Sequence, residues 1–111
     1  MSAALTRRLV LEERESAPDG AGGSVEAWAA RGAHWAAVSA VSARERTFGA
    51  RPASAVTHRA LIRFCEFGTL ERPVADQRFR EGERIFAIRG VSEADDRRER
   101  LICWLEEGAL S

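Results

Sequence analysis

Near the C-terminus, two short apolar runs at residues 85–88 and 101–105 flank a cluster of charge at residues 93–100. The cluster contains four acidic residues and three arginines, so it is poor material for a protein core. Apolar runs this short are typical of strands, and a polar segment between two of them is typical of a hairpin connection. The stretch therefore predicts a β-hairpin that pairs residues 85–91 with residues 100–105.

A helix across residues 93–107 is the alternative for the second run. Ser92 followed by Asp95 resembles a capping box, although such boxes prefer Glu or Gln at the second position, and a glycine follows at the far end. Acidic residues also precede arginines, as the helix dipole favours. However, Arg97 and Arg98 would occupy positions at which such a helix needs apolar side chains. We therefore expect the hairpin and keep the helix as the alternative.

The rest of the chain contains further short segments of strand character. Residues 5–14 have an apolar centre between charged flanks, and residues 16–24 form a glycine-rich breaker that contains Pro-Asp-Gly. Residues 58–67 alternate as a strand and include aromatic side chains that favour the pleat. Residues 42–57 and 68–82 have no persistent period, and we expect both to be connections.

Residues 25–41 support two interpretations. Their alanines favour a helix, and Trp28 and Trp35 lie seven residues apart, on one face of such a helix. Against this, Gly32 falls in the middle of the segment, and the residues after it alternate adequately as a strand. We expect two strand segments that are hinged near Gly32.

Together these segments predict an all-β fold, a small antiparallel β barrel or sandwich with long loops, with one short helix only as the alternative given above. A chain of 111 residues is expected to form a single domain over residues 1–111. We expect the apolar residues of the alternating runs to form mostly one core: Trp28, Trp35, Ile62, Phe64, Ile85, Phe86, Ile88, Leu101, Cys103 and Leu105.

The charge of the chain is balanced, with 17 acidic residues and 17 basic residues that are all arginine. A GC-rich genome explains the absence of lysine, and so does the suitability of the planar guanidinium for ion pairs at interfaces. A protein that binds nucleic acid usually carries a basic excess. No apolar stretch approaches the roughly 20 residues that span a bilayer, and no secretory signal is visible, so we expect a cytosolic protein with no membrane contact.

No pattern typical of an enzyme or a metal site appears in the sequence. The two histidines, His34 and His58, stand in strand-like surroundings, and the carboxylates occur as exposed pairs. Cys65 and Cys103 lie inside apolar runs with no Cys-x-x-Cys spacing, so we expect two free thiols rather than a disulfide or a zinc site. We expect no enzymatic activity and no cofactor.

A small β-barrel module that binds nucleic acid is the alternative function. Such modules stack bases on aromatic side chains over a basic groove. Here Phe64, Phe67, Phe86 and Trp104 lie in apolar runs that predict burial, and the arginines are mostly interleaved with acids. Interleaved charges suit ion pairs between proteins better than contacts to phosphate.

The motifs DGAGG, WAAVSAV, THRALIRF, LERP and GERIFAIRGVSEADDRRERLICWLEEG follow one another along nearly the whole chain. In this order they resemble the phage head–tail joining family, whose members also occur in gene transfer agents. The resemblance implies a head–tail adaptor, stopper or head-completion protein. Such a protein is a small β barrel that forms a ring between the portal and the tail, closes the DNA channel after packaging, and docks the tail.

The resemblance also implies partners and a location. Copies of the chain would form a sixfold or twelvefold ring in contact with portal or adaptor proteins and with tail-terminator or tail proteins. Double-stranded DNA would pass through the channel or be retained by it. The neck of a virion or of a gene-transfer-agent particle, assembled in the bacterial cytoplasm, is the expected location.

The charged turn at residues 93–100 is the expected contact between neighbouring subunits, and a solvated turn without a partner is the alternative. A turn with both signs of charge could set the register of a subunit against complementary charges on the next one. The residues expected to bind partners are Arg72, Arg78, Arg80, Arg84, Asp95, Asp96, Arg97 and Arg98.

Overall fold

The computed structural model describes residues 4–41 and 56–108, and within them the chain forms six strands and no helix. The strands are β1 (Arg7–Pro18), β2 (Ser24–Ala40), β3 (His58–Arg63), β4 (Arg78–Glu81), β5 (Arg84–Glu93) and β6 (Arg100–Glu107). The predicted all-β fold is confirmed. The helix considered for residues 93–107 does not form, because Leu101, Cys103 and Leu105 alternate along β6 and all face one interior.

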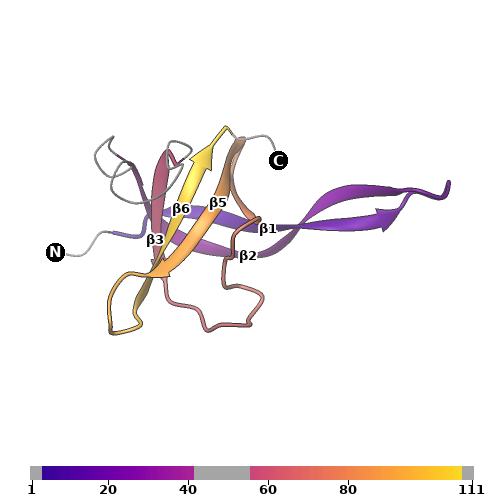
Figure 1. Ribbon diagram of the computed structural model, residues 1–111. Helices are drawn as coiled ribbons and strands as arrows, with labels where there is room; N and C mark the ends of the chain where they lie inside the picture. The colour runs from indigo at the N-terminus through magenta and orange to yellow at the C-terminus, as the bar shows by residue number, and fades with distance from the viewer. Residues whose placement is uncertain (1–3, 42–55, 109–111) are drawn as a thin grey trace.

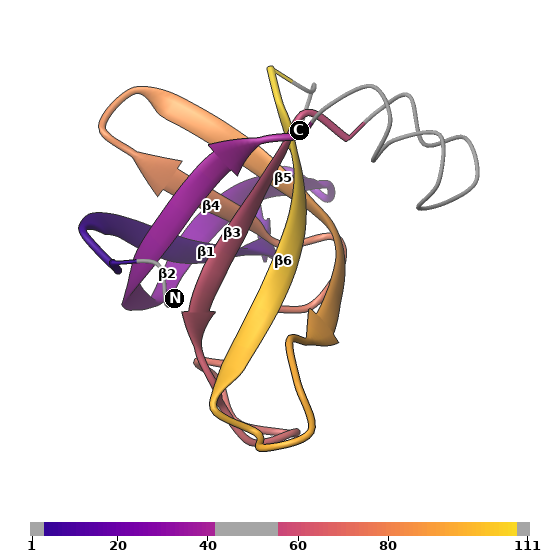
Figure 2. The same ribbon diagram turned by 90° about the vertical axis from the view of Figure 1, so that its left-hand side faces the viewer.

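The six strands close into an antiparallel barrel in the order β1-β2-β3-β6-β5-β4. The predicted hairpin of β5 and β6 is present, and it pairs residues 86–93 with residues 101–107. Two pairings join strands that are distant in sequence, β3 with β6 and β1 with β4. Figure 2 shows β3 and β6 side by side at the front of the barrel.

The hairpin of β1 and β2 is much longer than the barrel and projects from it as an arm (Figure 1). We define the arm as residues 13–31. On β1, only residues 10–12 pair with β4, and on β2, only residues 36–40 pair with β3. The arm strands therefore pair only with each other in the described chain, and the arm is a two-stranded ribbon. It gives the molecule a long axis of 54 Å against 28 and 25 Å in the other directions.

A β-bulge separates the barrel part of β2 from the arm. Leu11 pairs with Gly32 and Glu12 pairs with Ala30, so Arg31 is the extra residue on β2. Gly32 has φ of 141°, a conformation that residues with a side chain rarely adopt. The predicted hinge near Gly32 is thus confirmed, but the expected break into two segments is wrong, because β2 stays one continuous strand across the bulge.

Other boundaries also differ from the prediction. Strand β1 continues to Pro18, beyond the expected strand at 5–14 and into the expected breaker at 16–24, because it pairs with β2 along the arm. The expected strand at residues 58–67 ends at Arg63, and residues 64–77 form a loop. Strand β4 lies inside the expected connection at 68–82, because its four residues gain their stability from pairing with both β1 and β5 rather than from a local pattern. The expected connection at residues 42–57 lies mostly outside the described residues.

The core of the barrel contains six of the ten residues expected there: Ile62, Phe86, Ile88, Leu101, Cys103 and Leu105. Trp35 is 57% exposed, because its strand neighbours His34 and Ala36 face the interior and alternation turns Trp35 outward. Trp28, Phe64 and Ile85 are only partly buried. Core residues that the prediction missed are Leu9, Leu11, Ala36, Ala60 and Phe79.

Replacement of Phe86 by Ala should lower the free energy of unfolding by about 3–5 kcal/mol, because the ring is fully buried and its loss leaves a cavity. Chemical denaturation measures this change. Phe67→Ala is the matched control, since the Phe67 side chain is 70% exposed, and it should cost less than about 1 kcal/mol. Equal destabilisation by the two variants would contradict the assignment of Phe86 to the core.

Candidate functional site

Both histidines pack against the core of the barrel. His34 is buried, its Nε2 donates to the Glu71 carbonyl at 2.7 Å, and its ring packs edge-on against Phe79. Burial lowers the pKa of His34 despite the nearby carbonyl. The His58 ring packs against Phe86 in the same way. Each histidine therefore links a strand to the core.

In the part of the chain that the structure describes, the cysteines and acidic residues form no metal-binding cluster. Cys65 is half-buried and Cys103 is buried, and both are free thiols. Burial raises the pKa of Cys103 to about 12, which makes it a poor nucleophile. In residues 4–41 and 56–108, no three His, Cys, Asp or Glu side chains lie together as a metal site would need, and no helix there is long and apolar enough to cross a membrane.

Arg78 and Arg80, two residues expected to bind partners, converge on Glu12. Arg78 Nε donates to one carboxylate oxygen at 2.7 Å and Arg80 Nε to the other at 2.8 Å. Glu12 is only 6% exposed. Burial raises the pKa of Glu12, but the hydrogen bonds from the two arginines outweigh it and hold the pKa below its ordinary value. This cluster joins β1 to β4 at the seam that closes the barrel.

Arg84 and Arg72 also have partners within the chain. Arg84 Nε donates to Glu107 at 2.7 Å, and this pairing raises the pKa of Arg84. Arg72 is 7% exposed, donates to the Cys65 carbonyl at 2.9 Å, and lies 3.7 Å from the centre of the Phe67 ring. Arg72 thus holds the loop at 64–77 in place.

The remaining predicted residues, Asp95, Asp96, Arg97 and Arg98, lie together in the exposed turn between β5 and β6. Asp95 Oδ1 accepts a hydrogen bond from the backbone N–H of Arg97 at 2.9 Å. Arg98 reaches Glu66 at 3.5 Å, and its guanidinium lies 5.1 Å from the centre of the Phe64 ring. The turn therefore lies against the loop at 64–77.

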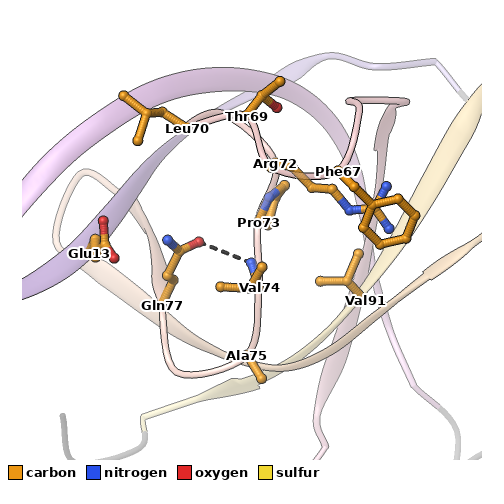
Figure 3. A pocket seen from close by; sticks show the side chains of 11 residues that line it. Glu13, Phe67, Thr69, Leu70, Arg72, Pro73, Val74, Ala75, Gln77 and Val91 are labelled. Atoms are coloured by element: carbon orange, nitrogen blue, oxygen red, sulfur yellow. Dashed lines mark hydrogen bonds between the residues drawn. The ribbon is translucent and has the colours of Figure 1, made fainter.

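That loop carries a surface pocket that the sequence analysis did not predict (Figure 3). The pocket has a volume of about 470 Å³ and is lined from the loop, from Glu13 at the base of the arm, and from Val91 on β5. Phe67, Leu70 and Val74 lie around it and are 70%, 70% and 50% exposed. Exposed apolar side chains gathered in one place are typical of a surface that binds another protein. The signal in the sequence was three apolar residues around the glycine and the proline of a polar loop, namely Phe67, Leu70 and Val74.

The fold and these surfaces define a class of protein: a small closed β barrel with a projecting arm and with exposed charged and apolar surfaces. The sequence profile described as phage head completion protein matches residues 1–108. The chain therefore belongs to the phage head completion protein family. No curated protein matches the chain.

Two solved structures are similar to the chain over almost its full length. A chain in the virion of a native gene transfer agent particle is 38% identical, with 98% of this chain and 100% of that chain covered and a TM-score of 0.72. Protein SF1141 from Shigella flexneri 2a, determined in solution, is 25% identical, with 96% of each chain covered and a TM-score of 0.75.

Glu12→Gln should lower the free energy of unfolding by about 3 kcal/mol, because it leaves the two arginines without their shared negative charge at a buried site. Urea denaturation at neutral pH measures this loss. Glu81→Gln is the matched control: Glu81 pairs with Arg7 where both side chains are more exposed, so its loss should cost about 0–1 kcal/mol. Equal effects would contradict the structural role of Glu12.

The comparison of wild type with Glu12→Gln also tests the pH dependence of stability. The pKa of Glu12 is lower in the folded protein than in the unfolded chain, so Glu12 contributes its full stability above the unfolded pKa. That contribution is lost as the pH falls through the folded pKa. The stability difference between wild type and Glu12→Gln should therefore shrink on acidification.

Proposed function

We propose that this protein is a structural connector in the neck of a phage-like particle. In this role it forms a ring between the portal or adaptor and the tail, closes the DNA channel after packaging, and docks the tail. Membership of the head completion family supports the proposal. The observation that carries it is the 38% identity to a chain of a gene-transfer-agent virion, over 98% of this chain and 100% of that chain. The protein acts through binding rather than catalysis.

The charge distribution suits a protein beside a DNA channel. When arginine or lysine side chains neutralise DNA phosphates, counterions are released from the DNA. This release is the main source of a protein's affinity for DNA. In the described part of the chain, most arginines are instead neutralised by a glutamate on a neighbouring element: Arg7, Arg14, Arg31, Arg78, Arg80, Arg84, Arg89 and Arg98. Internal pairing of this kind lets DNA slide past without being held.

The charged turn and the loop pocket form one surface that suits a neighbouring neck protein. Arg98 joins them through Glu66 and Phe64, and the N–H of Phe64 donates to the Glu99 carbonyl at 3.1 Å. The turn offers charges for orientation, and the apolar side chains around the pocket offer contact area. This division of roles is common at protein interfaces. We define this combined surface, residues 64–77 with 94–99, as the docking surface.

Removal of this protein from cells that produce the particles should yield DNA-filled or emptied heads without tails. The physical reason is that packaged DNA would lack its closure and the tail would lack its docking surface. Electron microscopy of the particles and measurement of nuclease-protected DNA test this outcome. Normal numbers of tailed, DNA-containing particles would contradict the proposed function.

Two variants should impair tail attachment while the monomer stays folded: Arg97→Glu/Arg98→Glu in the turn, and Leu70→Asp beside the pocket. The first variant adds negative charge beside Asp95 and Asp96, and the second places a charge among apolar side chains of the docking surface. Each replaced side chain is exposed, so the protein should still fold. Leu70→Met keeps the apolar contact and is the control. Normal tail attachment with both variants would show that the docking surface binds no neck protein.

A further inference from the structure

Three arginines differ from the paired ones in their surroundings. In residues 4–41 and 56–108, Arg8, Arg63 and Arg100 form no ion pair with an acidic side chain. The only hydrogen bond of the Arg100 guanidinium there runs to the neighbouring Glu99 carbonyl. Arg72 and Arg97 also form no ion pair in the described part of the chain, but both belong to the docking surface defined above.

Arg8, Arg63 and Arg100 form one row across the outer face of the barrel, together with Trp35. Arg8 is the partner of Trp35 between β1 and β2, and Arg63 is the partner of Arg100 between β3 and β6. Ala36 pairs with Ile62, which places Trp35 beside Arg63. Their strand neighbours Leu9, Ala36, Ile62 and Leu101 are fully buried, so alternation turns the row outward.

The row is part of a depression in the surface. Trp35, Arg63 and Arg100 line it together with Leu5, and its volume is about 780 Å³. Trp35 is 57% exposed, which is unusual for the largest apolar side chain. We name this site the basic depression. An aromatic side chain beside arginines is the composition typical of the centre of a protein interface.

The arm has the complementary properties. It contains four acidic residues and two arginines, so its net charge is −2. Arg31 is shared between Glu13 and Glu15, which leaves negative charge in excess at that point. Val25 near the tip is 52% exposed. In the described chain the two arm strands pair only with each other, so their outer edges offer unpaired backbone groups as well.

The arm and the basic depression lie at opposite ends of the molecule. The arm extends to the right in Figure 1, whereas β3 and β6, which carry Arg63 and Arg100, lie on the left. Figure 2 views the molecule from that left-hand side and has β3 and β6 in front. The arm therefore does not occupy the basic depression of its own copy, because the ribbon runs away from that depression.

We propose that the arm of one copy of this chain docks on the basic depression of the next copy. The contact is head-to-tail, because it joins two different surfaces, and repetition of such a contact closes a ring when the rotation between copies is right. The inference rests on the proposed function, which calls for a ring, and it names the two surfaces that build it. Opposite charges orient the arm, and Trp35 covers the apolar side chain near its tip.

Photo-crosslinking from the arm tests the contact directly. Benzoylphenylalanine at position 25 in particles assembled by producing cells should crosslink to a second copy of the chain, with the adduct on Leu5, Trp35 or the strand ends around Arg63 and Arg100. The same probe at position 74, where the native side chain is equally exposed, should give no adduct in the depression. Adducts from position 25 only on other neck proteins, or elsewhere on the same chain, would overturn the inference.

Charge reversal provides a second test of the contact. Arg63→Glu/Arg100→Glu should reduce the position-25 adduct about tenfold, since two attractions become repulsions. Arg89→Glu, an exposed reversal on β5 outside both the depression and the docking surface, is the control and should leave the adduct unchanged. Circular dichroism must show that both variants are folded. An unchanged adduct in the double variant would overturn the inference.

Two further outcomes separate this inference from the proposed function. If purified protein binds duplex DNA in a mobility-shift assay and the Arg63/Arg100 reversal abolishes binding, the basic depression holds phosphate rather than the arm, and the inference fails. The proposed function would then still stand, provided that particles lacking the protein remain tailless. If those particles are normal, the proposed function itself fails.

Discussion

Closure of the barrel depends on the short seam between β1 and β4, where only three residue pairs join the first strand to a strand of four residues. The buried carboxylate of Glu12 reinforces this seam by receiving Arg78 and Arg80 at once. A buried charge is tolerated only when it is paired and hydrogen-bonded, and here both carboxylate oxygens are. The bulge at Arg31 and Gly32 of β2 lies opposite Leu11 and Glu12 of β1. One stretch of β1 therefore both closes the barrel and borders the point at which the arm begins.

Arginines form paired contacts elsewhere in the chain as well. The planar guanidinium binds a carboxylate while stacking on a ring, as Arg98 does with Glu66 and Phe64. Such pairs connect loops and strand ends to neighbouring elements of the barrel. Against this neutralised background, an unpaired arginine or an exposed apolar side chain becomes informative, because it marks a surface that the fold itself does not need. The docking surface and the basic depression stand out in this way.

Much of the fold could be predicted from local pattern. The alternation in residues 85–105 indicated the β5–β6 hairpin correctly, and Gly32 indicated the hinge in β2. The strand β4 could not be predicted, because RFRE has no apolar alternation and is held by its two neighbours. Trp35 was assigned to the core because it is large and apolar, yet the parity of β2 places it outside. Of the residues expected to bind partners, the sequence could not show that Arg78 and Arg80 share one buried glutamate 66 and 68 residues away.

By itself, the sequence determined the all-β class, the hairpin and the hinge. It also determined the family resemblance, which the match to the head completion profile then confirmed. These depend on the period of the apolar residues and on the order of motifs, which are properties of the chain. Only the tertiary structure decided which arginines are neutralised, which apolar side chains remain exposed, and that the arm and the basic depression lie at opposite ends. The reason is that ion pairs and surface patches join residues from strands far apart in sequence, and their partners are fixed by strand order and register.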